Sequence, residues 1–356
     1  MITPEGTWID NRAKDLPRFK TGPMAHRGFA IIRRQDGALF TVGNYDASIS
    51  HDEGRTWENY KVTAPDMDFL IGDRAMVCTD KGTIVVGFKN HVDPYDVELE
   101  WDEHKRDWVA GSTTNFTMRS EDGGRTWVDV QELFSGIIGD NRDMIQTKEG
   151  KIVFSTMVVL HNPGRHAVVT YSSDDDGKTW KRSNIIDLGG SGHHDGVTEA
   201  ALAELSDGRV LLLLRTGWGY LWQAISDDGG RYWRTIGKTN ISASSAPCAI
   251  ERLVSGRLFL AWNQFYPEGK EEVNLRGADW AEIPMSWHRQ ELSIAFSEDD
   301  GQSWTKPVVI ARREDAGEES ELAYPHIFEP RPGVIWLGTE HGKLRIELNE
   351  EEFVGP

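Results

Sequence analysis

The sequence has little cysteine, no long apolar stretch and no excess of positive charge. Its 356 residues include only two cysteines, Cys78 and Cys248, too few for a disulfide framework. We therefore expect both to be small, buried apolar side chains. No stretch approaches the ~20 apolar residues that a membrane-spanning helix needs. The first residues lack the basic and apolar segments of a signal peptide, so we expect a cytoplasmic protein, or a secreted or periplasmic one if a leader was removed.

Basic residues are outnumbered by acidic ones. The chain has 39 Lys and Arg against 57 Asp and Glu, which gives a formal net charge of −18. Nucleic acids and anionic membranes bind to basic surfaces, because such surfaces release counterions or attract lipid headgroups. We therefore expect neither as a partner. The composition leaves the oligomeric state open, and it does not exclude a small anion held by a local basic cluster.

One motif that the sequence does contain is repeated five times and has the form S-x-D-x-G-x-[TSY]-W. Its copies begin at Ser50, Ser120, Ser173, Ser226 and Ser297. The Asp can accept backbone N–H bonds within its own turn, the Gly can adopt a positive φ, and the Trp can pack on the adjoining sheet. Each copy therefore predicts a turn between two antiparallel strands. Intervals of 53 to 71 residues between copies fit four-stranded blades with loops of variable length.

A second repeat runs out of phase with the first. Each of its copies has a leading residue, an apolar or alternating run, a Gly turn and a second apolar strand. The leading residues, 8 to 10 positions before the Gly, are Arg27, Arg74, Arg142, Glu199, Pro247 and Tyr324. Six such hairpins predict an all-β, six-bladed β-propeller of four-stranded antiparallel blades, as a single domain over residues 1–356. We expect the N-terminal segment around Thr7 to Ile9 to close the ring, because closure removes open sheet edges.

The leading residues of these hairpins point to a function. The innermost strands of a propeller begin around the central channel, so the six positions converge at one end of its axis. Charged and hydroxyl side chains placed there cost desolvation free energy unless the site is wet or occupied. The ring of Arg, Glu and Tyr therefore predicts a binding site at the channel mouth. The alternative is a rim of solvated side chains.

The turn repeats resemble the Asp boxes, or BNR repeats, of the exo-sialidase (neuraminidase) superfamily, and this resemblance spans nearly the whole chain. It implies an arginine triad whose first member is Arg27, which precedes an apolar strand and a Gly turn but lacks the family's following Ile-Pro. The family's glutamate and second arginine correspond to Glu199 and Arg215, at the two ends of Glu199-AALAELSDGRVLLLL-Arg215. The third arginine corresponds to Arg289, before the last turn repeat. The family's tyrosine corresponds to Tyr324.

The resemblance implies a retaining glycoside hydrolase that acts on a terminal sugar bearing a carboxylate, either sialic acid or a related sugar. Tyr324 would attack the anomeric carbon and Glu199 would accept its proton. The arginines would hold the substrate carboxylate by charge-assisted bonds. A carboxylate next to the reacting carbon would repel an anionic nucleophile, and sialidases use Tyr instead. The implied partner is a carboxylated glycan or glycoside, and no metal or cofactor is required.

The general acid is where the chain departs from the family. Sialidases place an Asp on a loop between the first hairpin and the first Asp box, and that loop is short here. Asp46 is the candidate by chain order, and Asp73 is the candidate by its place at the channel mouth. Arg74 is a further candidate for substrate binding. Arg74 and Arg142 also suit structural ion pairs with neighbouring acidic residues such as Asp140.

Other functions remain open. His194, in the segment 192–196, could act with Tyr324 in a polysaccharide lyase that removes the proton α to a uronic acid carboxylate. The adjacent His193 and His194 point to opposite sides of an extended chain and form a poor zinc pair. A noncatalytic propeller that binds an acidic glycan or protein is a third possibility. Three aromatic residues could stack on a sugar or pack within a blade: Trp218, Tyr220 and Trp222.

Overall fold

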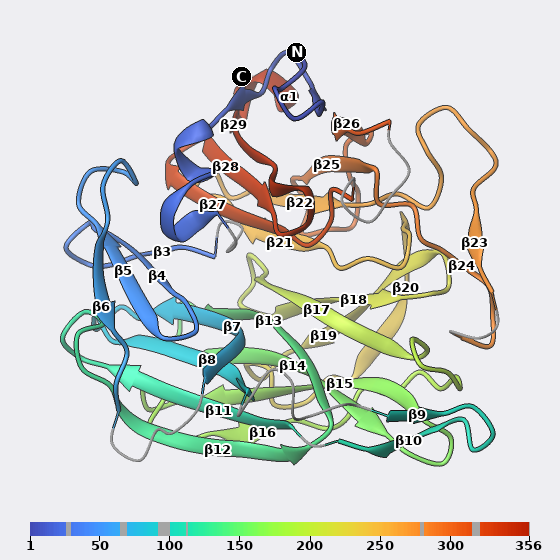
Figure 1. Ribbon diagram of the computed structural model, residues 1–356, viewed down its shortest axis with the longest axis horizontal. Helices are drawn as coiled ribbons and strands as arrows, with labels where there is room; N and C mark the ends of the chain where they lie inside the picture. The colour runs from blue at the N-terminus through green and yellow to red at the C-terminus, as the bar shows by residue number, and fades with distance from the viewer. Residues whose placement is uncertain are drawn as a thin grey trace.

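The structure, a computed structural model, is a six-bladed β-propeller of four-stranded antiparallel blades (Figure 1), which confirms the predicted fold class. It describes residues 1–25, 30–64, 70–91, 100–111, 113–277, 281–314 and 321–355. Within these ranges the helical elements are short: η1 (Pro17–Phe19), η2 (Gly22–Met24), η4 (His341–Lys343) and α1 (Glu351–Val354). No helix in these ranges has the length and apolar character needed to cross a bilayer.

The first three blades follow one another along the chain, each from its inner strand outwards. The first contains β3 (Ile32–Arg33), β4 (Leu39–Val42), β5 (Asp46–Ser50) and β6 (Glu58–Lys61). The second contains β7 (Leu70–Cys78), β8 (Ile84–His91), β11 (Thr113–Ser120) and β12 (Val128–Gly136), with a hairpin of β9 (Glu100–Asp102) and β10 (Asp107–Ala110) inserted after β8. The third contains β13 (Ile138–Gln146), β14 (Ile152–Leu160), β15 (Arg165–Ser173) and β16 (Lys181–Arg182).

The last three blades repeat this order. The fourth contains β17 (Val197–Glu204), β18 (Val210–Thr216), β19 (Tyr220–Ser226) and β20 (Thr235–Ser242). The fifth contains β21 (Ala249–Arg252), β22 (Leu258–Trp262), β25 (Glu291–Ser297) and β26 (Val308–Arg312), with a hairpin of β23 (Leu275–Arg276) and β24 (Met285–Ser286) inserted after β22. The sixth contains β27 (Pro325–Arg331), β28 (Val334–Thr339), β29 (Arg345–Asn349) and the N-terminal β2 (Lys14–Asp15).

The two ends of the chain meet in the sixth blade. β2 pairs antiparallel with β29, with Lys14 opposite Glu347, and the two termini lie close together in Figure 1. β1 (Trp8–Ile9) pairs instead with β26 and adds a fifth strand to the fifth blade. The prediction that residues 7–9 close the ring was therefore wrong, because β2 closes it and β1 does not. Closure by an N-terminal strand still ties the first and last parts of the chain into one sheet.

The turn repeats connect the third and fourth strands of their blades. In the copy between β15 and β16, Asp175 Oδ1 accepts bonds from the Thr179 N–H at 2.8 Å and the Ser173 hydroxyl at 2.9 Å. Asp175 Oδ2 accepts the Thr179 hydroxyl at 2.7 Å. Gly177 has a φ of 80°, which a glycine adopts without steric cost, and its N–H donates to Ser173 Oγ at 2.9 Å. The repeat is thus a turn closed by its own side chains, as predicted.

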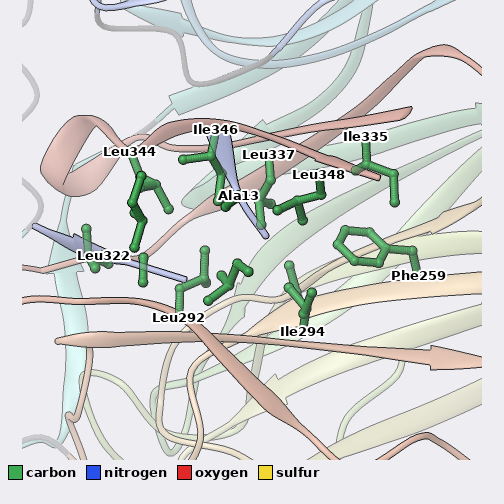
Figure 2. Packing of buried hydrophobic residues seen from close by; sticks show 14 of the residues in the cluster. Ala13, Phe259, Leu292, Ile294, Leu322, Ile335, Leu337, Leu344, Ile346 and Leu348 are labelled. Atoms are coloured by element: carbon green, nitrogen blue, oxygen red, sulfur yellow. The ribbon is translucent and has the colours of Figure 1, made fainter. Parts of the chain in front are cut away.

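Apolar side chains fill the space between neighbouring blades. Figure 2 shows one such cluster, in which Ile294 and Phe259 of the fifth blade face Ile335 and Leu337 of the sixth. Each of these four side chains is at most 1% exposed. Full burial of one such side chain stabilises a fold by about 1.5–3 kcal/mol. Because the packing joins one blade to the next, it also fixes where each inner strand begins around the axis.

The two cysteines lie in different environments. Cys248 is 4% exposed, and burial raises the pKa of its thiol to about 12. Cys78, on β7, is only half-buried, so the expectation of two buried cysteines holds fully for one of them.

We predict that Asp175→Ala lowers the free energy of unfolding by about 1–2 kcal/mol, because the turn loses the acceptor for three hydrogen bonds. Urea unfolding followed by tryptophan fluorescence measures this change. Lys178→Ala, at an exposed position of the same turn, is the control and should be neutral. Equal stability of both variants and the parent protein would contradict a stabilising role for the turn.

Candidate active site

Three side chains from two blades meet at one end of the axis. Tyr324 immediately precedes β27, Glu199 lies near the start of β17, and Arg215 lies on β18. Tyr324 Oη donates a hydrogen bond to Glu199 Oε1 at 3.1 Å. Arg215 Nη1 lies 2.5 Å from Glu199 Oε2 and 3.5 Å from Tyr324 Oη. Side chains that are 125 positions apart in the sequence thus form one hydrogen-bonded triplet.

The backbone of Tyr324 is held in an unusual conformation. Its φ is 60°, in the left-handed region that a residue with a side chain seldom adopts. Its carbonyl accepts the Glu340 N–H at 3.1 Å, and the carbonyl of Ala323 accepts the His341 N–H at 3.3 Å. The phenol ring also stacks on the His341 ring, with centroids 4.6 Å apart. Strained residues that surrounding contacts hold in place are often found at functional sites.

The charges around the triplet set its protonation states. Burial disfavours the charged form of Glu199, but the nearby cations of Arg215 and Arg142 outweigh burial and lower its pKa. Burial and the Glu199 charge together raise the pKa of the Tyr324 phenol, against the opposing effect of Arg215. At neutral pH the glutamate is therefore an anion and the tyrosine is a neutral donor. This arrangement can pass the phenol proton to the carboxylate.

A second group of side chains surrounds Arg289. Arg289 is 2% exposed, and it donates to Glu321 Oε2 at 3.2 Å and to the Ser245 carbonyl at 2.7 Å. Its guanidinium carbon lies 3.7 Å from the centre of the Trp287 ring. The indole N–H of Trp287 donates to Glu321 Oε1 at 3.0 Å. The hydroxyl of Ser245 accepts a bond from Arg215 Nη2 at 3.1 Å, so Ser245 connects the two arginines.

A cavity of about 840 Å³ opens beside these groups. Its lining includes Tyr324, Arg289, Trp287, Arg276 and His194. Glu199 and Arg215 are almost fully buried, at 4% and 3% exposure. The volume falls in the range of small-molecule sites, which is about 300–1,000 Å³. The cavity therefore has room for a sugar in contact with the phenol and with cationic side chains.

A carboxyl pair lines a smaller cavity of about 220 Å³, and Glu340 lines both cavities. Asp73 forms an ion pair with Lys89, whose ammonium nitrogen lies 3.5 Å from Asp140 Oδ1. Burial opposes ionisation of Asp73, but the charge of Lys89 outweighs it and lowers the pKa of this carboxyl. Burial and the neighbouring Asp73 raise the pKa of Asp140 well above its ordinary value. Asp140 is therefore the more basic of the two carboxyls.

The remaining candidates lie in several places. Asp46 begins β5, two strands outward from the inner strand of the first blade, and its carbonyl accepts the Gly43 N–H at 2.7 Å. Arg74, on β7, donates to Asn44 Oδ1 at 3.3 Å and lines the smaller cavity. Arg27 lies outside the described residues.

Arg142 forms an ion pair, but its partner comes from another blade. Its guanidinium lies 3.3 Å from Glu340 Oε1 of the sixth blade and 5.0 Å from the centre of the Tyr324 ring. The adjacent Asp143 instead accepts the Leu202 N–H at 2.7 Å from the fourth blade. Arg142 thus binds the sixth blade, which is not adjacent to the third, whereas Asp143 binds the adjacent fourth blade.

His194 and the aromatic trio occupy different surroundings. His194 lines the large cavity, with its ring centroid 5.7 Å from that of Trp287. Burial and the nearby Arg215 lower the pKa of its imidazole to about 2. The trio makes contacts within its own blade: Trp218 packs edge-on against Trp222 at 5.7 Å, and the Lys238 ammonium lies 3.8 Å from the centre of the Tyr220 ring.

Comparison with known proteins was made on the sequence and on the fold. The sequence model of the family described as BNR repeat-like domain matches residues 99–337, more than half of the chain. The chain belongs to the BNR repeat-like family. A sialidase from Micromonospora viridifaciens is 26% identical over 335 residues, which cover 81% of this chain and 46% of that protein. The BNR repeat-like chain therefore spans about half the length of this curated relative. These matches confirm the sialidase/BNR-repeat superfamily that the sequence predicted.

Solved structures share the propeller at low identity. A protein of unknown function from Dyadobacter fermentans is 18% identical, with a TM-score of 0.62 over 89% of this chain and 92% of that chain. The intramolecular trans-sialidase from Ruminococcus gnavus is 14% identical, with a TM-score of 0.55 over 90% of this chain and 94% of that chain. The NanB sialidase from Streptococcus pneumoniae is also 14% identical, with a TM-score of 0.55 over 90% and 67% of the two chains. At these identities the likeness shows the fold of the BNR repeat-like chain.

Several residues that the BNR repeat-like fold brings to the cavity could not be predicted from the sequence repeats. Arg276 and Trp287 belong to the inserted segment of the fifth blade, and Glu321 precedes the sixth. Their only sequence signal is position, since Trp287 lies two residues before Arg289 and Glu321 lies three before Tyr324. Neither residue belongs to a repeat, so the repeat pattern alone could not identify them.

We predict that Glu199→Gln lowers the pKa of Tyr324, because the Glu199 charge is one of the causes that raise it. Phenolate absorbance measured against pH reports this change. The chain has eight tyrosines, so the signal of Tyr324 is the difference between each protein and its Tyr324→Phe counterpart. An unshifted difference curve in the Glu199→Gln background would show that the two groups are not coupled.

Proposed function

We propose that this BNR repeat-like protein is a sialidase-like, retaining exo-glycosidase that hydrolyses a terminal carboxylate-bearing sugar, sialic acid or a related one. The observation that carries the proposal is the 3.1 Å hydrogen bond from Tyr324 Oη to Glu199 Oε1 beside a cavity lined by arginine. A neutral phenol is a weak nucleophile, and it needs a base within hydrogen-bond distance to become an effective one. The low pKa of Glu199 keeps that base ionised.

The reaction has two steps. In the first, Tyr324 Oη bonds to the anomeric carbon, its proton passes to Glu199, and the bond to the leaving oxygen breaks as a general acid protonates that oxygen. In the second, water bonds to the anomeric carbon and gives a proton to the former acid. The bond from the sugar to Tyr324 then breaks, and the phenol recovers its proton from Glu199. Two displacements retain the configuration at the anomeric carbon.

The arginines have separate roles in this proposal. Arg289 lines the cavity and presents a guanidinium to the substrate carboxylate, which it can bind by paired charge-assisted hydrogen bonds. Arg215 donates to Glu199 at 2.5 Å, so its first role is to hold the base and keep it ionised. We propose two further substrate-binding residues: Arg74, which lines the smaller cavity, and Arg27, which lies outside the described residues.

We propose that the carboxyl pair of Asp73 and Asp140 supplies the general acid, with the proton on Asp140. Lys89 pairs most closely with Asp73 and keeps it ionised, and the Asp73 charge favours the protonated form of Asp140. When Asp140 is ionised, its charge raises the pKa of Tyr324. The carboxyl pair therefore lies within electrostatic reach of the nucleophile. Asp46 is less suited, because it lies two strands outward from the channel.

The lyase alternative depends on His194 as a base. Burial and Arg215 lower the pKa of this imidazole to about 2 and keep it neutral. Arg215 lowers the pKa of Glu199 as well, so the choice between the two bases rests on geometry. The hydrogen bond from Tyr324 Oη to Glu199 Oε1 at 3.1 Å favours the hydrolase over the lyase.

We predict that Tyr324→Phe lowers hydrolysis of a 4-methylumbelliferyl sialoside by at least about 1,000-fold, because the variant keeps the ring but loses the attacking oxygen. Fluorescence of the released aglycone measures the rate. Tyr232→Phe, at an exposed tyrosine of a turn repeat, is the matched control and should keep full activity. Undiminished hydrolysis by Tyr324→Phe, or an unsaturated product from uronic polysaccharides, would argue against the proposed reaction.

We also predict that Asp140→Asn slows cleavage of a natural sialoglycan about 100-fold, and cleavage of an aryl sialoside far less, because an aryl leaving group needs little protonation. A raised pKa of the acid means that kcat/KM falls as the pH rises through that pKa. This alkaline limb should disappear in Asp140→Asn. It should move to lower pH in Asp73→Asn, since Asp73 raises the pKa of Asp140. Asp140 would be excluded as the acid if Asp140→Asn lost the same activity on both substrates and kept the alkaline limb of kcat/KM unchanged.

A further inference from the structure

We infer that Arg276 binds the anionic group of the substrate, as an additional cation to which the family resemblance gives no role. The inference rests on the proposed function and specifies part of its binding site. Arg276 ends β23, where it pairs in register with Met285 of β24. The hairpin is inserted between β22 and β25 of the fifth blade, so a paired strand positions the residue.

The geometry places Arg276 together with the other cations of the site. Its guanidinium carbon lies 4.1 Å from the centre of the Trp287 ring. The guanidinium carbons of Arg289 and Arg215 lie 3.7 Å and 5.6 Å from the same ring centre. Three arginines from different segments thus surround one indole. Arg276, Arg289 and Trp287 all line the large cavity, as does Tyr324.

Trp287 can hold these cations close together. The face of an indole attracts guanidinium groups, by about 0.5–1 kcal/mol at exposed sites and about 2 kcal/mol when desolvated. The ring is itself fixed, because its N–H donates to Glu321 at 3.0 Å. Two guanidinium groups on one ring repel each other, and a bound anion beside them relieves that repulsion. The arrangement is therefore suited to an anionic ligand in the cavity.

Arg215 is poorly placed to bind that ligand by itself. Unlike Arg276 and Arg289, it is not among the residues that line the large cavity, and its guanidinium binds Glu199 at 2.5 Å and the Ser245 hydroxyl at 3.1 Å. Arg276 is half-buried and lines the cavity directly. A carboxylate in the cavity could accept charge-assisted bonds from Arg276 and from Arg289, and a lysine lacks the planar fork that makes paired bonds to a carboxylate. The chemical class of ligand is therefore a sugar acid.

The test is calorimetric titration with N-acetylneuraminic acid, D-glucuronic acid and the methyl ester of each. We expect the wild-type protein to bind at least one acid. Arg276→Ala should weaken binding of that acid at least about 10-fold and binding of its ester less than about 2-fold, since only the acid is charged. Arg276→Lys should recover the loss only in part. Arg234→Ala, which removes an exposed arginine whose side chain is 58% accessible, controls for the change in net charge.

Three results would overturn the inference: unchanged acid binding by Arg276→Ala, equal losses for acid and ester, or no binding of either acid by the wild-type protein. Thermal melting checks the fold, and Arg276→Gln replaces the Ala variant if that variant melts early. Hydrolysis of a 4-methylumbelliferyl sialoside separates this inference from the proposed function. If the wild-type protein hydrolyses the sialoside and Arg276→Ala binds the acid as tightly as wild type does, only this inference is rejected. If acid binding depends on Arg276 but the wild-type protein does not hydrolyse the sialoside, the inference is supported and the proposed hydrolase is rejected.

Discussion

The buried ion pair between Arg215 and Glu199 is the contact on which the rest of the site depends. Removing two charges from water costs several kcal/mol per ion, and the attraction between them repays this only when the geometry is good. Here Arg215 Nη1 lies 2.5 Å from Glu199 Oε2, and the other Glu199 oxygen accepts the Tyr324 hydroxyl. Without Arg215 the pKa of this carboxyl would rise, because burial opposes its ionisation and Arg215 is the largest of the cations that offset burial. A protonated carboxyl could not accept the phenol proton.

The propeller makes this contact possible by holding separate blades at fixed angles. Tyr324 precedes the inner strand of the sixth blade and Glu199 lies on that of the fourth, so neither could find the other through local structure. Side chains such as Phe259 and Leu337 pack between neighbouring blades and exclude water from the seams. The closing pair of β2 with β29 prevents the sixth blade from separating from the chain's N-terminal part. Rigid packing also sustains the positive φ of Tyr324.

The repeated turns and inner strands could be predicted from the sequence, whereas the site residues in an inserted segment could not. The turn repeats are local, since Asp175 accepts bonds only from residues within four positions of it, so the residue pattern specifies the structure directly. Blade symmetry then brought Tyr324 and Glu199 into the same prediction. Arg276 and Trp287 lie in the segment inserted between β22 and β25, outside both sequence repeats. The raised pKa of Asp140 could not be predicted either, because it depends on burial and on the positions of Asp73 and Lys89 in the neighbouring blade.

Charge distribution connects the fold to the kind of substrate that the proposed site would accept. The chain carries a net charge of −18, so its overall field repels a polyanion approaching along its length. Several cationic side chains instead line the cavity, where Arg276 and Arg289 lie against the same indole. Charge–charge attraction acts strongly over short distances. A single acidic sugar at the end of a glycan can reach these cations while the rest of its chain stays outside. The exo-specificity that we propose would then follow from where the positive charge lies.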